Sequence, residues 1–139
     1  PKQMAAGKYN FTIEQGATVD FEVQYKDSNS LPVNLSGYQA RMQLRPEAGS
    51  NTIYTTLSSS LGPCGTGLNL SGSGGTNASK PLSSGSIGVY ISALSSSAFT
   101  FESALYDLEI ASGSGNCAKV TRLLEGVVKL SKNITLGGF

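Results

Sequence analysis

Apolar and polar residues alternate with a period of two along several segments of this 139-residue chain. The alternation is clearest in five segments: residues 9–14, 18–26, 38–45, 103–111 and 118–131. Because successive side chains of a strand point to opposite faces, this pattern predicts strands that bury one face and expose the other. Residues 52–57 and 86–92 show a weaker form of the pattern, and Leu68 with Leu70 predicts one more short strand.

These segments predict an all-β chain with a single immunoglobulin-like β-sandwich domain over residues 1–139, built from about seven to nine antiparallel strands. Residues 1–8 are expected to form an extended N-terminal arm. One turn of helix is expected at residues 93–99, where serine can cap it. Gly126, inside the long last strand, predicts a bend or a β-bulge there.

Residues 58–84 differ sharply in composition from the rest of the chain. They are rich in serine and glycine and contain only scattered leucines. Such a segment has few large apolar side chains to bury, so we expect an inserted Ser/Gly-rich loop that contributes little core. The loop would be either mobile or ordered by a partner.

Charge and hydropathy exclude several classes of partner. Charged residues make up only 14% of the chain, and ten basic against nine acidic residues give a net charge of +1 with no basic stripe. Nucleic-acid binding is therefore not expected. No apolar run is long enough for a membrane span and residues 1–8 lack the apolar core of a signal peptide, so we expect a soluble chain with no membrane partner.

The residue types required for most catalysis are missing or scattered. The chain has no histidine, so the usual activator of a nucleophilic serine is absent. Most carboxylates alternate on the predicted wet faces of strands, which indicates solvated side chains rather than an acid–base pair. The Asp27-Ser28-Asn29 turn lacks the glycine and the distal glutamate of a calcium loop. We therefore expect no enzyme activity, no metal and no cofactor.

Three residues carry the remaining candidate roles. Cys64 and Cys117 both lie in glycine-containing, loop-like segments; they could form one disulfide, or remain as buried or exposed thiols. Tyr106 lies early in the predicted penultimate strand. It is either a tyrosine corner, whose hydroxyl bonds back to a neighbouring loop, or a plain core aromatic.

Five tyrosines leave a carbohydrate-binding or adhesin-type sandwich open as an alternative function. Sugar recognition would need several of these rings on one exposed face, whereas most of them fall in register with core residues. Exposure of Tyr54 and Tyr90 would favour this alternative. The five residues are Tyr9, Tyr25, Tyr38, Tyr54 and Tyr90.

Four segments together resemble a known family of virion proteins. They are residues 11–18, residues 31–45 with the phrase LSGYQARMQLR at 35–45, residues 105–109, and VTRLLEG at 120–126. The chain resembles small tailed-bacteriophage virion proteins, and most closely the immunoglobulin-like N-terminal module of phage baseplate upper proteins and related tail adaptors. The resemblance covers most of the chain apart from residues 58–84.

The resemblance implies a non-enzymatic structural component of a tailed phage virion, in its tail, baseplate or neck. It implies a location in the virion, assembled in the host cytoplasm, with several copies in a symmetric ring. The partners would be other virion proteins of the tail, baseplate, neck or fibre. Because open strand edges can accept a strand from a neighbour, we expect docking through edges and loops: first the last strand and residues 1–8, then residues 58–84.

Overall fold

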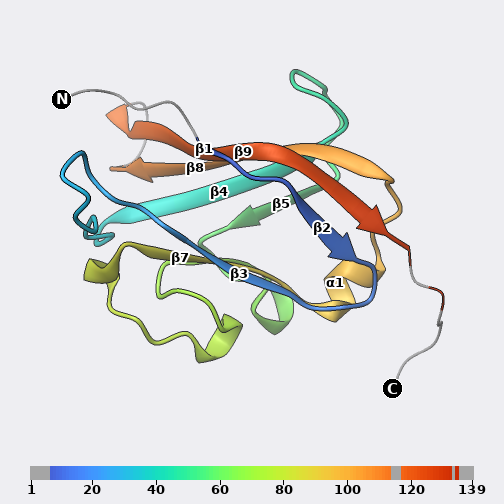
Figure 1. Cartoon of the computed structure of the whole chain (residues 1–139), viewed down its shortest axis with the longest axis horizontal. Coiled ribbons are helices and arrows are strands. Elements are labelled where there is room, and N and C mark those ends of the chain that lie inside the picture. Colours follow the sequence, from blue (N-terminus) through green and yellow to red (C-terminus); the bar gives the residue numbers. More distant parts are fainter. Residues whose placement is uncertain (1–6, 114–116, 133, 135–139) are drawn as a thin grey trace.

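The computed structural model describes residues 7–113, 117–132 and 134. Two β-sheets lie face to face (Figure 1). The expected all-β sandwich is confirmed. Residues 1–6 of the expected N-terminal arm lie outside the described residues, whereas Gly7 and Lys8 form a short strand, β1, on the larger sheet.

The larger sheet has six strands, in the order β1-β9-β8-β4-β5, with β2 also paired to β9. Its strands are β1 (Gly7–Lys8), β2 (Phe11–Glu14), β4 (Tyr38–Arg45), β5 (Thr55–Ser58), β8 (Ser103–Ser112) and β9 (Lys119–Ser131).

The smaller sheet has three strands, in the order β3-β7-β6. They are β3 (Val19–Gln24), β6 (Gly67–Asn69) and β7 (Ser86–Ile91). The helical elements are short: the 3-10 helices η1 (Pro63–Gly65), η2 (Gly75–Asn77) and η3 (Leu82–Ser84), and the α-helix α1 (Ala93–Ser97). The hydroxyl of Ser92 caps α1 by accepting a hydrogen bond from the Ser95 N–H, so the expected serine-capped turn of helix is confirmed.

The strand order is that of an immunoglobulin variable-type sandwich. The series β9-β8-β4-β5 corresponds to strands G, F, C and C′, and β3-β7-β6 corresponds to B, E and D. The expectation of purely antiparallel pairing is wrong at one place, because β1 and β2 run parallel to β9. Period-two patterning shows where strands lie but not their direction, and the first and last strands are free to run parallel since no hairpin joins them.

The core lies between the inward faces of the two sheets. From the larger sheet come Met42 and Leu44 on β4, and Leu108 and Ile110 on β8, all buried. From the smaller sheet, Ile87, Val89 and Ile91 on β7 are fully buried. Each such side chain contributes about 1.5–3 kcal/mol when it leaves water, so the alternating positions identified in the sequence supply the main stabilisation.

The Ser/Gly-rich segment is part of the fold. It contains β6, and Leu68 within β6 is fully buried against the core. The predicted short strand is therefore confirmed: β6 pairs with β7, from Gly67 opposite Tyr90 to Asn69 opposite Gly88. The expectation that this segment adds little core is confirmed as well, since Leu68 is its one fully buried core residue among those described.

The bulge in β9 lies at Leu123 rather than at Gly126. Leu108 of β8 pairs with Leu124, and the next residue, Glu109, pairs with Arg122, which leaves Leu123 as the extra residue. Gly126 is needed for a different reason. A Cβ at this position would overlap the Tyr9 carbonyl, because the segment between β1 and β2 crosses closely over β9 there.

Candidate interaction surface

The outer face of the six-stranded sheet carries charged side chains in rows that run across the strands. In one row, Arg41 of β4 lies opposite Glu109 of β8, which lies opposite Arg122 of β9. The Arg41 Nε donates to Glu109 Oε1 at 2.8 Å. Both arginine side chains are more than half exposed, at 64% for Arg41 and 52% for Arg122. This row therefore presents a positive–negative–positive pattern to solvent.

The neighbouring row has the opposite balance. Gln43, Asp107, Glu125 and Lys8 lie opposite one another in turn across β4, β8, β9 and β1. Partial burial, followed by repulsion from the neighbouring Glu109 carboxylate, raises the pKa of Asp107 above its ordinary value, although two arginines act against this. The Arg122 Nε lies 3.3 Å from the Asp107 carboxylate and links the two rows.

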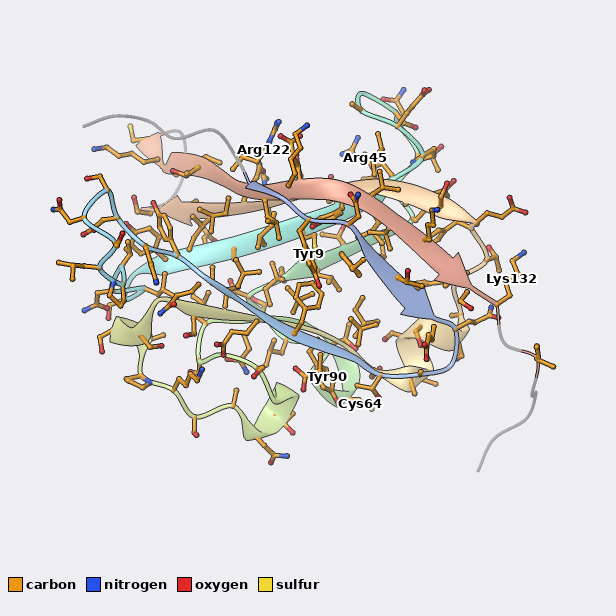
Figure 2. All side chains as sticks on the ribbon, viewed as in Figure 1. Tyr9, Arg45, Cys64, Tyr90, Arg122 and Lys132 are labelled. Atoms are coloured by element: carbon orange, nitrogen blue, oxygen red, sulfur yellow. The ribbon has the colours of Figure 1, made fainter. Side chains whose placement is uncertain are left out.

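These rows form the floor of a shallow hollow of about 660 Å³. The β4–β5 connection forms one wall, where the Arg45 guanidinium donates to the Ser50 carbonyl and to Gln43 Oε1. Figure 2 shows Arg45 and Arg122 on this outer side of the larger sheet, away from Cys64 and Tyr90. Four cations and four carboxylates line the hollow: Lys8, Arg41, Arg45 and Arg122, with Glu47, Asp107, Glu109 and Glu125.

This surface presents fixed charges of both signs. Its charges are balanced in number, and two ion pairs, Arg41–Glu109 and Arg122–Asp107, link its strands. Exposed charges of this kind can exchange partners with a complementary polar surface. The described part of the chain contains no group of three or more histidine, cysteine, aspartate or glutamate residues that could hold a metal ion.

The outer face of the three-stranded sheet is partly covered: β7 is buried, while the outward residues of β3 remain exposed. A strap, which we define as residues 71–80, folds back across β7 and β3. A Cβ on Gly88 of β7 would overlap the Gly72 backbone, and the Gly75 backbone lies against the ring of Tyr90. As a result, β7 is buried on both faces at most of its positions.

Two carboxylates of β3 hold the strap in place through hydrogen bonds. Asp20 accepts a hydrogen bond from the Gly74 N–H, and Glu22 accepts one from the Ser73 N–H at 3.1 Å. The Lys80 Nζ donates to both carboxylate oxygens of Glu22, at 2.8 and 2.9 Å. The hydrogen bond from Lys80, followed by that from Ser73, lowers the pKa of Glu22. Asp20 and Glu22 are exposed on β3, as the alternation predicts, and they also hold the strap through hydrogen bonds that the alternation does not show.

Tyr106 is a core aromatic and also a hydrogen-bond donor. Its ring is buried, packs edge-on against Phe11 at 5.1 Å, and its hydroxyl donates to the Tyr9 carbonyl. In a tyrosine corner the acceptor lies a few residues upstream, whereas here it belongs to the segment between β1 and β2. Tyr106 therefore fastens the N-terminal strands to the sandwich, and burial raises the pKa of its hydroxyl.

The two cysteines are not brought together. Cys64 lies in η1, close to the smaller sheet, and Cys117 lies just before β9 of the larger sheet. Both are free thiols with exposed side chains.

The tyrosines do not form one exposed platform. Tyr54 is 38% exposed and stacks on Phe101 at 4.7 Å, while Tyr90 is partly buried beneath Gly75 of the strap. Tyr9 is 46% exposed but belongs to a separate aromatic cluster with Phe11. Exposure of both Tyr54 and Tyr90 would have favoured the carbohydrate-binding alternative. Tyr54 is exposed but Tyr90 is partly buried, so this condition is not met.

The sequence alone identifies only the part of this surface that lies on β4. The alternation of Arg41, Gln43 and Arg45 with core residues marked the outer face of β4. The carboxylates opposite these residues depend on the register of β4 with β8, whose paired residues lie more than 60 positions apart. The bulge at Leu123 separately shifts the register of β8 with β9 by one residue. The alternation of apolar and polar residues within one segment shows neither the register between strands nor the position of the bulge.

No family model matches this chain, and no curated protein matches it. Within the described residues, none of the helices is both long and apolar enough to cross a membrane. Interpretation of the surface therefore rests on its geometry and on the resemblance given by residues 11–18, 31–45, 105–109 and 120–126.

Proposed function

We propose that this protein is a non-enzymatic structural component of a tailed phage virion, a tail, baseplate or neck adaptor that docks neighbouring virion proteins. The resemblance described above supports the phage context. The geometry supports the docking role, because an immunoglobulin-like sandwich with an open charged face and open strand edges offers surfaces for protein partners.

The observation that carries the proposal is the contrast between the two outer faces. The central strand of the smaller sheet, β7, is covered by residues of the same chain, whereas the larger sheet presents Arg41, Glu109 and Arg122 in a fixed row on the floor of a shallow hollow. Balanced charges held in register select a partner and its orientation more than they add raw affinity. An adaptor that occupies one defined place in a ring requires this kind of specificity.

The absence of histidine from the sequence and the pairing of the carboxylates support a non-catalytic role. The Arg41–Glu109 and Arg122–Asp107 pairs hold these acidic groups against cations instead of directing them at a common substrate position. General acid–base catalysis requires a group free to exchange its proton with a substrate.

The test is incorporation into tail particles assembled without this protein. The mass of the purified chain is measured by light scattering, and the chain is then mixed with the particles and sedimented. We expect a monomer that incorporates. The double variant Arg41→Gln/Arg122→Gln is expected to incorporate about tenfold less well, since each lost interfacial charge pair weakens docking.

The matched control removes two positive charges elsewhere, as Lys26→Gln/Lys132→Gln, at exposed positions outside the charged face. It should incorporate like the unchanged chain. A wild-type chain that stays free in the presence of the particles would contradict the adaptor role. Equal incorporation of both double variants would exclude the charged face as the docking surface.

A further inference from the structure

Strand β3 forms an open edge of the smaller sheet. The sheet ends at β3, and none of the described residues pairs with its second edge. Constant-type immunoglobulin domains place their first strand, A, beside strand B, which corresponds to β3 here. In this chain the N-terminal strands β1 and β2 pair with β9 of the other sheet instead, so the position of strand A beside β3 is vacant in the described structure.

This edge lacks most of the usual protection against pairing with other chains. Natural edges are shortened, bulged, or carry proline or charged side chains, especially lysine, and of these β3 has only the outward carboxylates of Asp20 and Glu22. β3 is six residues long (VDFEVQ), contains neither proline nor lysine, and pairs with β7 without a register shift. The sheet edges at β5 and β6 have four and three residues. Of these three edges, β3 offers the longest ladder of main-chain donors and acceptors.

The inward side of β3 is also incompletely covered. Val19, Phe21 and Val23 point toward the core but are only partly buried, whereas their partners on β7 are fully buried. Phe21 forms an aromatic strip with Phe11 and Tyr9, at ring-centroid distances of 5.0 and 5.5 Å. Figure 2 shows Tyr9 between the larger sheet and β3. The open side of the sandwich therefore exposes an apolar strip along the edge.

The outward side of the same edge is acidic. Asp20 and Glu22 alternate with the apolar residues, and each already accepts hydrogen bonds from the strap. Lys80 forms an ion pair with Glu22, so the net negative charge of this side is that of Asp20. A carboxylate has about four acceptor positions, so both can accept a further donor from a strand beside β3. A strand placed there would set its inward side chains against the aromatic strip and its outward side chains beside the two carboxylates.

We propose that the edge of β3 accepts an extended strand from a neighbouring protein, in which apolar residues alternate with lysine or arginine. Main-chain hydrogen bonds to β3 provide the register, the apolar residues cover Phe21 and Tyr9, and the basic residues meet Asp20 and Glu22. This proposal rests on the docking role proposed above and names the chemistry of one partner segment.

The test uses the isolated full chain and a nine-residue peptide that alternates isoleucine with lysine. We expect the peptide to protect the β3 amides that do not bond to β7 from hydrogen exchange, and to shift their NMR signals. Two control peptides are a block arrangement of the same residues and an alternation of isoleucine with glutamate. Both are expected to bind at least tenfold more weakly, because alternation and basic charge are both required.

The decisive comparison is between the unmodified peptide and an N-methylated one, with the protein unchanged. N-methylation of the amides that face β3 removes the main-chain donors without altering the protein, and should abolish protection. The variant Val23→Lys, which places a charge inward at the edge, should do the same. Binding that survives N-methylation would overturn the proposal. So would β3 amides that are already protected in the free chain, because the edge would then be covered.

The two proposals can fail separately. If the chain does not incorporate into tail particles but the alternating peptide protects β3, the edge accepts strands and the phage adaptor role is wrong. If the chain incorporates but the peptide leaves β3 unprotected, docking uses other surfaces.

Discussion

The outer faces of the two sheets differ in whether residues of the same chain lie on them. On the smaller sheet, β7 carries Ser86 and Gly88 on its outer side, and the strap of residues 71–80 lies directly on it. On the larger sheet, β4 and β8 carry Arg41 and Glu109 outward; the Arg41 side chain is mostly exposed and the Glu109 side chain is partly buried beside it. The smaller sheet uses this face for its own stability, while the larger sheet keeps it open.

Side-chain size explains the difference. A backbone can approach a strand closely only where the strand has no large side chain, and Gly88 provides that space for Gly72. Long charged side chains keep their heads in water and hold other backbone away. A strap rich in glycine suits the first situation, since glycine adopts the positive φ values seen at Gly72, Gly74 and Gly75.

The largest expected effect comes from filling the space beneath the strap. The variant Gly88→Val should displace the Gly72 backbone and lower the free energy of unfolding by about 1–3 kcal/mol, the usual cost of overpacking. Urea denaturation measures this loss, and hydrogen exchange of the Ser73 and Gly74 amides should show that it arises at the strap.

The matched control is Thr56→Val on β5, an exposed position in the row of Gln43 on the open face. Threonine and valine have similar shape, so the free energy of unfolding should change by less than about 0.5 kcal/mol. If Gly88→Val is equally harmless, the strap does not depend on close approach to β7 and the comparison fails.

The sequence predicted the strands well because their signal is local. The expected boundaries of β4, at Tyr38–Arg45, match the structure, since alternation there is uninterrupted and flanked by Ser36-Gly37 and Pro46. The strap could not be predicted in the same way. Its order comes from Asp20 and Glu22, more than 50 residues away, and a Ser/Gly-rich composition looks the same whether or not distant carboxylates bind its backbone.

The candidate surface was predictable only in part for the same physical reason. The outward position of Arg41 follows from β4 alone, but its pairing with Glu109 follows from the register of β4 with β8. The parallel placement of β1 and β2 on β9, which leaves β3 without a strand A, depends on long-range packing. The sequence pattern is compatible with either placement of the first strand.

The next effect compares one ion pair from each face. Glu22→Gln removes a carboxylate that binds both Lys80 and the Ser73 N–H, so we expect a loss of about 1 kcal/mol in the free energy of unfolding. Arg41→Gln removes an equally short pair with Glu109 that has similar exposure but no additional backbone donor, and should cost at most about 0.5 kcal/mol. Similar losses of unfolding free energy in both variants would mean that the strap contacts of Glu22 contribute no more stability than a surface ion pair does.

The pH dependence of Glu22→Gln gives an independent check. The folded pKa of Glu22 lies below its ordinary value of 4.5. The unfolded chain therefore binds this proton first as pH falls, and the contribution of Glu22 is present above about pH 4.5 and is lost as pH falls through the folded pKa. The stability difference between wild type and Glu22→Gln should shrink in that acidic range. A constant difference down to pH 2 would place the effect of the variant elsewhere.

The smallest effect should have the opposite sign and lies on the open face. Burial and the Glu109 carboxylate raise the pKa of Asp107 above its ordinary value of 3.8, despite the arginines nearby. Below about pH 3.8 the carboxyl is protonated in both states, and stability falls as pH rises through the folded pKa, because the unfolded chain releases the proton first. Asp107→Asn should therefore stabilise the protein at pH 7 by a few tenths of a kcal/mol, within the usual range for surface substitutions.

Arg122→Gln removes the cation of the same ion pair, and its effect on stability should have the opposite sign to that of Asp107→Asn. It removes a cation 3.3 Å from the Asp107 carboxylate, so it should raise the pKa of Asp107 further in an NMR titration and slightly destabilise the chain. Destabilisation by Asp107→Asn would instead show that the ion pair with Arg122 outweighs burial and repulsion. The charged rows would then stabilise the fold itself, and the larger sheet would resemble the smaller one in using its outer face for its own stability.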